Sequence, residues 1–495
     1  MADSESATTK AEPKLSWADV ESDEEKEASA LSSEAAVPSE LNKIESLSIA
    51  DVKDGENQAA DVPDASRLLE DPDESDIKAV TSGDTVYTSA VAFEDLNLSN
   101  ELINGLYVEM GFSRPSKIQA ITLPMILTPP YKDLVAQAHN GSGKTTCFVL
   151  GMLSRVDPSK KVPQAICVCP TRELAQQNHA VLMKMGKYTG ITAMCAIPTD
   201  SSSYIPINKR PPVTDQVVIG TPGTIKKWTT AKKLSTRDIK ILVFDEADHM
   251  LAEDGFRDDS ERLRKEIQRS SGGCQVLLFS ATFNENVKAF VSRVISDGNQ
   301  IFVKKEELTL EKVKQYKVLC PNENAKIEVI KNKIFEFGQK VGQTIIFVRT
   351  RHSASMLHRS LSQEGYECTS VQGALSQEDR DKIIKEFKDG LTKVLITTDL
   401  LARGFDQRQV NLVINYDLPV KHTNPSEPDC ELYLHRVGRT GRFGSKGAVF
   451  NFLCTDRDKL VMEKIQQHFQ HPIPEISDWR SEEAFESALK DAGLL

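Results

Sequence analysis

Two successive series of apolar runs constrain the fold of this chain more than any other feature. The first series reads DLVAQA, QAICVCP, QVVIG, IKILVFD and CQVLLFSAT, and the second reads GQTIIFV, CTSVQG, KVLITTD, VNLVINYD and GAVFNFL. Helical stretches separate these runs, and near-continuous apolar strands that alternate with helices are typical of parallel sheets covered on both faces. The sequence therefore predicts an α/β protein with two such sheets, one after the other.

The length of the chain agrees with two domains. At 495 residues the chain is too long for one ordinary core, since domains usually hold roughly 100–200 residues. No apolar run approaches the roughly 18 residues that a membrane span needs, and residues 1–10 lack the apolar segment of a secretory signal. We expect no membrane insertion and a location inside the cell, in the cytoplasm or the nucleus.

The cysteines indicate neither a metal site nor a disulfide framework. All 9 are scattered, without the C-x-x-C spacing of a zinc ribbon. Cys167 and Cys169 alternate within QAICVCP, which predicts that both pack on one face of a strand. A metal or redox role is the alternative interpretation of this pair.

The net charge of −11 is distributed unevenly. Residues 1–80 hold 22 acidic and 7 basic side chains, a net charge of −15, while residues 81–495 hold 50 acidic and 54 basic side chains, a net charge of +4. The acidic segment contains too few apolar residues to form a core, so we expect residues 1–85 to be disordered. The rest of the chain could face a polyanion.

One stretch of the acidic segment differs from its surroundings. Within residues 39–52, apolar side chains recur at a spacing that could line one face of a short helix that binds a partner or the chain itself. These side chains are Leu41, Ile44, Leu47 and Ile49.

The same patterns predict the domain boundaries. We expect the first sheet within residues 86–304 and the second within residues 318–480. Residues 305–317 are charged and poor in strand signals, which indicates a linker. Residues 481–495, SEEAFESALKDAGLL, predict a peripheral C-terminal helix.

The stretch DLVAQAHNGSGKTTCFVL predicts a phosphate-binding loop between a strand and a helix. Successive backbone N–H groups in such a loop point at a phosphate chain at the helix N-terminus. Lys144 would reach the β and γ phosphates, and the Thr145 hydroxyl would complete the shell of Mg²⁺. Ala138 stands where such loops usually have their first glycine, and a chance glycine-rich turn is the alternative. The predicted nucleotide-binding residues here are Ala138, His139, Asn140, Gly141, Ser142, Gly143, Lys144, Thr145 and Thr146.

The stretch ILVFDEADHML supports a nucleotide site, because a strand ends there in several carboxylates. A phosphate loop needs a carboxylate from a second strand to hold Mg²⁺, and Asp245 is suitably placed. Glu246 can orient and activate a water. We therefore predict Lys144, Asp245 and Glu246 as catalytic and Thr145 and Asp245 as metal ligands; a solvated acidic turn is the alternative.

With the phosphate loop before it and SAT at residues 280–282 after it, DEAD at residues 245–248 resembles the DEAD-box ATP-dependent RNA helicases. The resemblance runs from Phe93 to Phe452 and includes several short motifs in the family order. It implies two tandem RecA-like domains, each a parallel sheet with helices on both faces, after a disordered acidic N-terminal tail. It also implies ATP and Mg²⁺ as cofactors and RNA as a partner.

The segment GFSRPSKIQ resembles the adenine-reading segment of that family. The Gln119 carboxamide can donate one hydrogen bond to adenine and accept another, and the Phe112 ring offers a face for stacking. This resemblance implies a preference for ATP over GTP.

Two further motifs of the first domain, PTRELA and TPGT, resemble the family's contacts to the RNA backbone. Thr171, Arg172, Thr221 and the Gly223 amide can bind phosphate oxygens without reading bases; two ordinary turns are the alternative. The family usually has a Gly-Gly pair between these motifs, where this chain reads CAIPTDSSSYIPINKRPP.

The second domain lacks a phosphate loop, which implies one ATP for both domains. Its motifs TTDLLARGFD and HRVGRTGRFG resemble family motifs. The resemblance implies that Thr398 contacts RNA, that Gly404 and Asp406 contact the ribose of ATP, and that Arg439 and Arg442 are catalytic fingers on the γ phosphate.

Two more sets of residues follow from the same resemblance. In QGALSQEDR, the resemblance implies that Arg380 contacts RNA, although a capped helix start would explain this segment equally well. His435 and Arg436 would couple the ATP and RNA sites.

This distribution of parts predicts an ATP-dependent RNA helicase. Hydrolysis would require the two domains to close around ATP, RNA would stabilise the same closed state, and each ligand would tighten binding of the other. Closure would unwind RNA locally or remodel ribonucleoprotein. The alternatives are an ATP-gated RNA clamp that does not need turnover, and a DNA helicase, which equal stimulation by DNA and RNA would indicate.

The segments AHNGSGKT and NYDLPVKHTNPSEPDCELYLHRVGR resemble the branch that works in mRNA export at the nuclear pore, most closely its plant-type members. That branch implies mRNA, a cytoplasmic-face nucleoporin and an inositol-phosphate-dependent activator as partners of a monomer at the nuclear envelope or pore. The acidic tail could bind the basic RNA surface in cis and inhibit, or it could only solvate.

Overall fold

The structure is a computed structural model of the whole chain. It describes residues 77–81, 87–137, 142–198, 205–252, 255–295, 297–303, 313–335, 342–373, 375–402, 405, 407, 409–441 and 446–495. Residues 1–76, which hold most of the acidic segment and the predicted helix at residues 39–52, lie outside the described residues.

The first domain is built on an eight-stranded sheet with the order β1-β8-β2-β7-β6-β3-β5-β4. Its strands are β1 (Ile77–Val80), β2 (Asp133–Gln137), β3 (Ala165–Val168), β4 (Ala193–Ala196), β5 (Val217–Gly220), β6 (Ile241–Phe244), β7 (Gln275–Ser280) and β8 (Gly298–Val303). All neighbouring pairs from β8 to β4 are parallel. The strand pattern therefore confirms the predicted parallel sheet.

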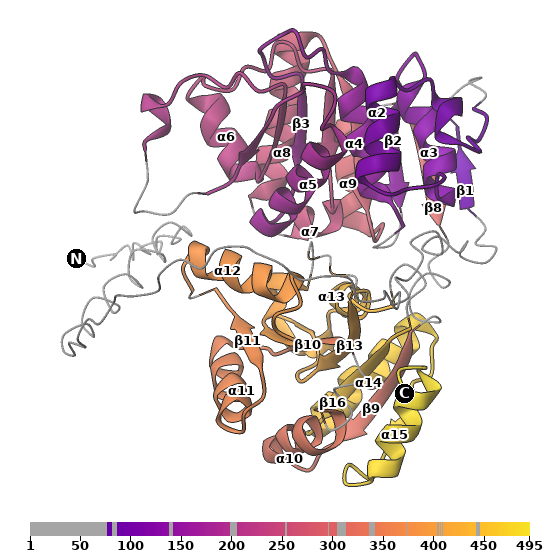
Figure 1. Cartoon of the computed structure of the whole chain (residues 1–495), viewed down its shortest axis with the longest axis vertical. Helices are drawn as coiled ribbons and strands as arrows, with labels where there is room; N and C mark the ends of the chain where they lie inside the picture. The colour runs from indigo at the N-terminus through magenta and orange to yellow at the C-terminus, as the bar shows by residue number, and fades with distance from the viewer. Residues whose placement is uncertain are drawn as a thin grey trace, which may run out of the picture. The chain divides into compact units, whose positions relative to one another are not determined.

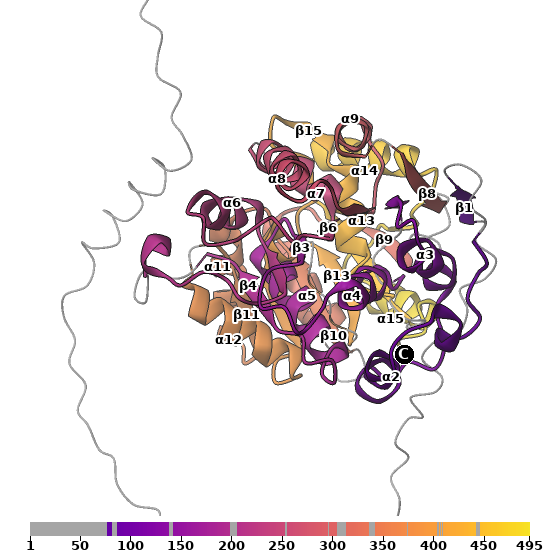
Figure 2. The same ribbon diagram turned by 90° about the horizontal axis from the view of Figure 1, so that it is seen from above.

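Strand β1 departs from this prediction in two ways. It pairs antiparallel with β8, with Ile77 opposite Val303, so the sheet is not wholly parallel. It also lies within residues 1–85, where we expected disorder. The four residues IKAV are too short a signal to stand out from a charged segment, but they can form hydrogen bonds with the free edge of β8. Figure 2 shows β1 beside β8 at the edge of the domain.

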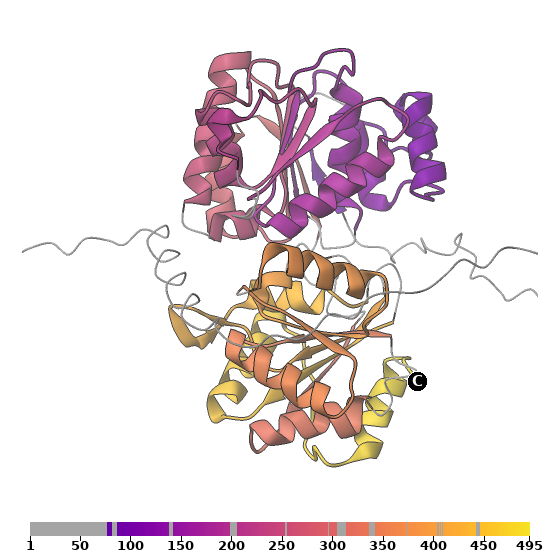
Figure 3. The same ribbon diagram turned by 60° about the vertical axis from the view of Figure 1, so that its left-hand side comes forward.

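Helices cover both faces of the first sheet, as Figure 3 shows. Alternate strand residues face opposite sides: Leu134 and Ala136 belong to one buried cluster and Val135 to another. The first cluster includes residues of α3 (Lys117–Leu127), α4 (Lys144–Arg155) and α5 (Arg172–Met185), next to α2 (Asn100–Asn104). The second includes residues of α6 (Pro222–Thr230), α7 (Ala247–Ala252), α8 (Phe256–Ser271) and α9 (Glu285–Val294).

The second domain is built on a seven-stranded parallel sheet with the order β11-β12-β10-β13-β16-β9-β17. Figure 1 labels β9, β10, β11, β13 and β16 of this sheet. Its strands are β9 (Lys314–Leu319), β10 (Gln343–Phe347), β11 (Cys368–Val371), β12 (Val394–Thr397), β13 (Val410–Asn415), β16 (Ala448–Leu453) and β17 (Glu475–Ile476). Its helices are α10 (Glu323–Val329), α11 (Arg351–Gln363), α12 (Gln377–Lys388), α13 (Cys430–Val437), α14 (Asp456–Phe469) and α15 (Glu482–Asp491).

The linker predicted at residues 305–317 overlaps strand β9. This strand starts at Lys314 and pairs with β16 along its whole length. Its buried Tyr316 and Val318 stand on either side of Lys317. The lysines hid the strand in a segment that looks uniformly charged. Of the predicted linker, residues 305–312 lie outside the described residues.

The C-terminal helix α15 packs into the core of the second domain and is not peripheral. Phe485 and Leu489 are fully buried in the same cluster as the strands of the sheet. The rings of Phe485 and Phe450 lie 5.7 Å apart. The sequence did not indicate this burial. The helix starts with the acidic residues Glu482 and Glu483, and its few apolar side chains do not form a continuous run.

The residues between the LP and YLHR segments form a hairpin. Strands β14 (Val420–Lys421) and β15 (Asn424–Pro428) pair antiparallel. Lys464 of α14 donates to Glu427 at 2.7 Å. The Asp429 side chain then accepts a hydrogen bond from the Leu432 amide and caps α13, so the hairpin leads directly into the helix that carries HRVGR.

The described residues contain no helix long and apolar enough to cross a membrane. Cys167 and Cys169 are both buried in the first cluster, with their sulfurs 3.8 Å apart. Both are free thiols. Their place in one cluster confirms the prediction that they pack on the same face, at and just after the end of β3.

Candidate nucleotide and RNA site

The phosphate loop joins β2 to α4, and the structure describes its second half. Helix α4 begins at Lys144, and Gly143 before it has a left-handed backbone with φ of 101°. A side chain at Gly143 would place its Cβ 2.5 Å from the Gln119 amide nitrogen. The left-handed conformation therefore favours glycine here, and a larger residue would also have to displace the Gln119 side chain. Ala138, His139, Asn140 and Gly141 lie outside the described residues.

The start of α3 holds the phosphate loop in place. The Ser116 hydroxyl donates to the Ser142 carbonyl at 3.0 Å, and the Gln119 amide donates to the Gly143 carbonyl at 3.3 Å. Gln119 also accepts from the Ser116 amide in a capping box. The predicted adenine reader is thus buried and bonded to the loop, and adenine would have to share its amide. The ring of Phe112, the predicted stacking partner, is half-buried against the first cluster.

Lys144 is buried among carboxylates. Burial lowers the pKa of its ammonium group, and the negative charges of Asp245, Glu246 and Asp248 oppose that shift. Thr145 beside it is half-buried and Thr146 is buried. The structure thus brings the predicted phosphate-binding lysine and the predicted carboxylates together.

Asp245 and Glu246 follow directly after β6, which lies between β3 and β7. Burial and the charge of Glu246 raise the pKa of Asp245 to about 6, against the influence of Lys144 and of a hydrogen bond from Asn178. Glu246 is buried and has a left-handed backbone with φ of 49°, an uncommon conformation that is typical of functional turns.

The last residue of the DEAD motif bonds the SAT motif. The Asp248 carboxylate accepts hydrogen bonds from the amide and the hydroxyl of Thr282, at 3.2 and 3.0 Å. The Asp248 amide donates to the Ser280 hydroxyl at 3.2 Å. His435 of α13 also contacts this carboxylate, with 3.4 Å between Nε2 and Oδ2. Asp248 therefore connects the two motifs of the first domain with the HRVGR motif.

Arg439 follows α13 and is buried. Its guanidinium donates to the His435 carbonyl at 3.0 Å and to the Phe405 carbonyl. Its positive charge is one of the causes that lower the pKa of Lys144, which places it near the phosphate loop. The second predicted finger, Arg442, and the predicted ribose contacts Gly404 and Asp406 lie outside the described residues.

The predicted RNA contacts of the first domain lie at two helix N-termini. The Thr171 hydroxyl caps α5 by accepting from the Leu174 amide at 3.2 Å. Thr221 precedes α6 and donates to the Thr224 hydroxyl at 3.1 Å. Gly223, in the first turn of α6, has open space around it. Helix N-termini favour phosphate binding, so these positions fit the predicted contacts to RNA phosphates, which stay a prediction.

The two arginines predicted to bind RNA, Arg172 and Arg380, lie close to carboxylates in this structure. Arg172 is paired with Asp381 of α12 at 2.6 Å. Arg380 donates to the carbonyls of Leu375 and Gly373 and lies 4.0 Å from Glu173. An RNA phosphate would have to replace these carboxylates as the partner of the guanidinium groups.

Thr398 stands at the end of β12, before the helical turn Asp399–Leu401. The buried Arg436 donates two hydrogen bonds to the Asp399 carboxylate, at 2.8 and 2.5 Å, and one to the Asp417 carbonyl. Arg436 thereby joins α13, which precedes the finger arginines, to the turn that carries Thr398. These bonds all lie within the second domain, so the coupling role of Arg436 stays a prediction.

Sequence reasoning missed Asn178 and Ser116. Asn178 donates to Asp245 across 67 positions of sequence, and Ser116 bonds the phosphate loop across 26. The S-x-x-Q spacing of a capping box was a signal for Ser116. No local pattern marks Asn178, because its contact depends on the adjacency of β3 and β6.

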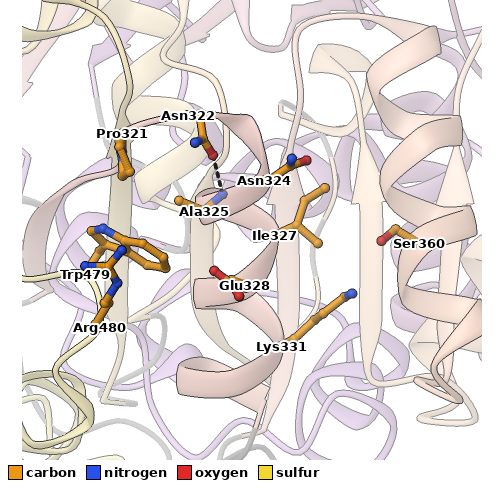
Figure 4. Close-up of a pocket in the computed structure, with 10 residues that line it drawn as sticks. All are labelled: Pro321, Asn322, Asn324, Ala325, Ile327, Glu328, Lys331, Ser360, Trp479 and Arg480. Atoms are coloured by element: carbon orange, nitrogen blue, oxygen red, sulfur yellow. Dashed lines mark hydrogen bonds between the residues drawn. The ribbon is translucent and has the colours of Figure 1, made fainter.

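A pocket of about 480 Å³ in the second domain, shown in Figure 4, contains none of the predicted site residues. Trp479 and Arg480 form one side of it, with the guanidinium 4.7 Å from the indole ring. Asn322, which also lines the pocket, uses its side chain to cap α10.

The fold and the site define the class of this protein. Two RecA-like α/β domains in tandem, the first with a buried lysine of a phosphate loop beside paired carboxylates, are the architecture of a nucleotide-dependent helicase. Comparison with known proteins agrees. The DEAD/DEAH box helicase model matches residues 116–290, and the helicase conserved C-terminal domain model matches residues 325–444.

Relatives extend this match over almost the whole chain. DEAD-box ATP-dependent RNA helicase 38 of Oryza sativa subsp. japonica is 68% identical over 463 residues, 93% of this chain and 92% of that protein. Its namesake in Arabidopsis thaliana is 64% identical over 429 residues, 86% of each chain. The chain belongs to the DEAD-box family of ATP-dependent RNA helicases, which confirms the resemblance found in its motifs.

Solved structures with the same fold include the yeast protein Dbp5. The structure of S. cerevisiae Dbp5 bound to RNA and ADP BeF3 has 37% sequence identity and a TM-score of 0.73, and the match covers 81% of this chain and all of that one. A Dbp5 variant bound to Nup159, a Gle1 variant, IP6 and ADP matches with 35% identity and a TM-score of 0.56, over 80% of this chain and 99% of that one.

Proposed function

We propose that this helicase hydrolyses ATP at the site around Lys144 and uses the cycle to remodel messenger ribonucleoprotein during mRNA export. The observation that carries the proposal is the convergence of Lys144, Asp245 and Glu246 at the carboxyl ends of β2 and β6. Lys144 binds the β and γ phosphates, Glu246 orients the attacking water, and Arg439 with Arg442 stabilises the charge on the γ phosphate.

The residues fit Mg²⁺. The Thr145 hydroxyl and the Asp245 carboxylate are hard oxygen ligands, and Mg²⁺ bound with nucleotide keeps several waters and takes only one or two ligands from protein. The described residues contain no group of three acidic, His or Cys side chains that could hold a metal by itself, and this mode of binding requires none. When bound, the ion neutralises the phosphate oxygens during transfer.

RNA is bound through phosphates at the N-termini of α5 and α6 together with Arg380 and Thr398, so binding does not select a base sequence. The relatives support a place in mRNA export, with a nucleoporin and an activator that depends on inositol phosphate as partners at the nuclear pore. Dbp5 has been seen with Nup159, Gle1 and IP6.

ATPase activity with and without single-stranded RNA tests the catalytic assignment. We expect RNA to stimulate the wild type, and Lys144→Ala to lose at least about a hundredfold because the phosphate ligand is missing. Arg359→Ala, a change on the exposed face of α11, should keep wild-type activity. Activity that ignores both RNA and the Lys144 change contradicts the proposal.

Glu246→Gln separates this enzyme from an ATP-gated RNA clamp. The variant should still bind ATP and RNA but should not hydrolyse ATP. If cells that contain only this variant export polyadenylated RNA normally, turnover is dispensable and the clamp is the better description. We expect polyadenylated RNA to accumulate in the nucleus.

A further inference from the structure

Asn178 is an amide in a position where the fold calls for an apolar side chain. It lies on the buried face of α5 with Leu174, Ala175 and Leu182 and is itself fully buried. Its Oδ1 accepts no hydrogen bond from the described residues. Burying an amide that is only half satisfied costs free energy that a leucine in this position would not cost.

The other end of this amide contacts the nucleotide site. Asn178 Nδ2 donates to Asp245 Oδ2 at 2.8 Å and lies 3.4 Å from the sulfur of Cys169. A carboxylate can only accept, so the Asn178 amide must present its nitrogen to Asp245. Hydrogen bonds to an ionised group are stronger than those between neutral groups. This bond therefore offsets part of the cost of burying a polar residue in the core.

The bond from Asn178 completes the fixation of the Asp245 carboxylate. The other oxygen, Oδ1, accepts from the Glu246 amide at 3.0 Å. One bond to each oxygen prevents rotation of the carboxylate and leaves a further lone pair on each oxygen for a ligand. The bond from Glu246 comes from the motif itself, whereas the bond from Asn178 comes from a different helix.

That helix is the one whose N-terminus carries Thr171 and Arg172. Asn178 lies six residues after Arg172, about 9 Å along a rigid helix. We propose that Asn178 is a positioning residue that orients the Asp245 carboxylate toward the metal-bound nucleotide and joins it to the predicted RNA-binding end of α5. This inference rests on the proposed function, in which Asp245 is a ligand of Mg²⁺.

Binding of fluorescent ADP with Mg²⁺ and with EDTA tests the inference without turnover. Mg²⁺ should tighten binding to the wild type. In Asn178→Leu, which is of similar size but has no donor, the gain from Mg²⁺ should fall at least about tenfold, the lower end of the range for one hydrogen bond to a charged group. Binding in EDTA should stay within about twofold of the wild type.

Asn178→Ala gives a second test, because it also removes the donor but leaves space where leucine fills it. The same loss in both variants assigns the effect to the hydrogen bond. Gln164→Leu is the matched control: this buried amide lies just before β3, where it bonds Asp157 and Lys160, so its loss should not alter the gain from Mg²⁺.

Affinity for labelled single-stranded RNA without nucleotide separates positioning from damage to α5. It should stay within about twofold in both Asn178 variants, because Thr171 and Arg172 remain in place. If the gain from Mg²⁺ is unchanged in the variants, the positioning role of Asn178 is wrong. The same holds if RNA affinity falls by as large a factor as the gain from Mg²⁺; neither result contradicts the proposed function. If Mg²⁺ does not change the ADP affinity of the wild type, the assignment of Asp245 as a ligand of Mg²⁺ is wrong, and this inference is wrong with it.

Discussion

The glycine at position 143 determines which conformation the phosphate loop can adopt. Gly143→Ala adds a Cβ 2.5 Å from the Gln119 amide and 3.1 Å from the Ser116 hydroxyl, at a backbone with φ of 101°. The strain alone costs about 1–3 kcal/mol, and the displaced Gln119 loosens the loop. We expect a lower Tm and at least about tenfold weaker ADP binding, measured by thermal unfolding and fluorescence titration.

Gly223→Ala is the control for this change. Gly223 has a negative φ, and a Cβ added there would meet no atom within 4 Å, so the Tm of this variant should match the wild type. An equal Tm for both variants would show that the close contact at Gly143 does not constrain the loop.

The buried carboxyl of Asp133 should make the stability of the first domain depend on pH. Burial raises its pKa to about 6, although its Oδ1 accepts from the Val276 amide at 2.7 Å. A raised pKa means that the folded state binds the proton more tightly, so this contribution to stability is full below about pH 4 and is lost as the pH rises through about 6.

Asp133→Asn keeps the acceptor for Val276 but cannot ionise. Its stability relative to the wild type should therefore grow between pH 4 and pH 7, by at most about 3 kcal/mol for a shift of about two pH units. Urea unfolding of the first domain at several pH values measures this. Glu285→Gln, a change at an exposed carboxyl, should show no such trend; a difference for Asp133→Asn that does not vary with pH would contradict the assignment.

At the scale of single residues, the sequence predicted which side chains the structure brings together in the candidate site where the motifs are local. Lys144, Asp245 and Glu246 stand in short motifs whose spacing sets their geometry. Asn178 could not be predicted, because its bond to Asp245 arises from the packing of α5 against the strands and not from any pattern in α5. The bonds of Gln119 to the phosphate loop were missed for the same reason: the motif names a residue type but not its partner in the absence of ligand.

At the scale of elements, apolar runs predicted the central strands of both sheets, since such strands are buried on both faces. Strands β4, β8, β14, β15 and β17 also lie outside the predicted runs. Of the other missed strands, β1 has only four residues and β9 contains two lysines. Their pairing partners, β8 and β16, supply the stability that their own composition does not indicate. Tertiary pairing thus determines elements whose local signal is weak.

Helix α15 is an integral element of the second domain, and Phe485→Ala tests this. The ring is fully buried against Phe450, so truncation leaves a cavity that costs about 3–5 kcal/mol. We expect the unfolding transition of the second domain to shift to lower urea while the first is unchanged. Glu486→Ala, which removes only an exposed ion pair with Lys490, should leave both transitions in place.

At the scale of the whole molecule, charge divides the chain at the start of the first sheet. Residues 1–76 hold 22 acidic and 6 basic side chains, and the remaining residues carry a net charge of +5. Because β1 belongs to the sheet, a deletion that tests the acidic segment has to stop before Ile77. Removal of residues 1–80 would also expose the edge of β8 and confuse the two effects.

Deletion of residues 1–76 distinguishes an inhibitory acidic segment from a solvating one. If the segment competes with RNA for basic side chains, the shortened chain should bind RNA several-fold more tightly and show higher RNA-stimulated ATPase at low salt. The advantage should shrink above about 0.2 M salt, since screening weakens both the competition and RNA binding.

A scrambled segment with the same composition is the control, because it preserves charge but not sequence. Unchanged RNA affinity and ATPase at low salt, together with lower solubility, would instead assign the segment a solvating role, because removal of its net charge of −16 would then alter only the repulsion between copies of the chain.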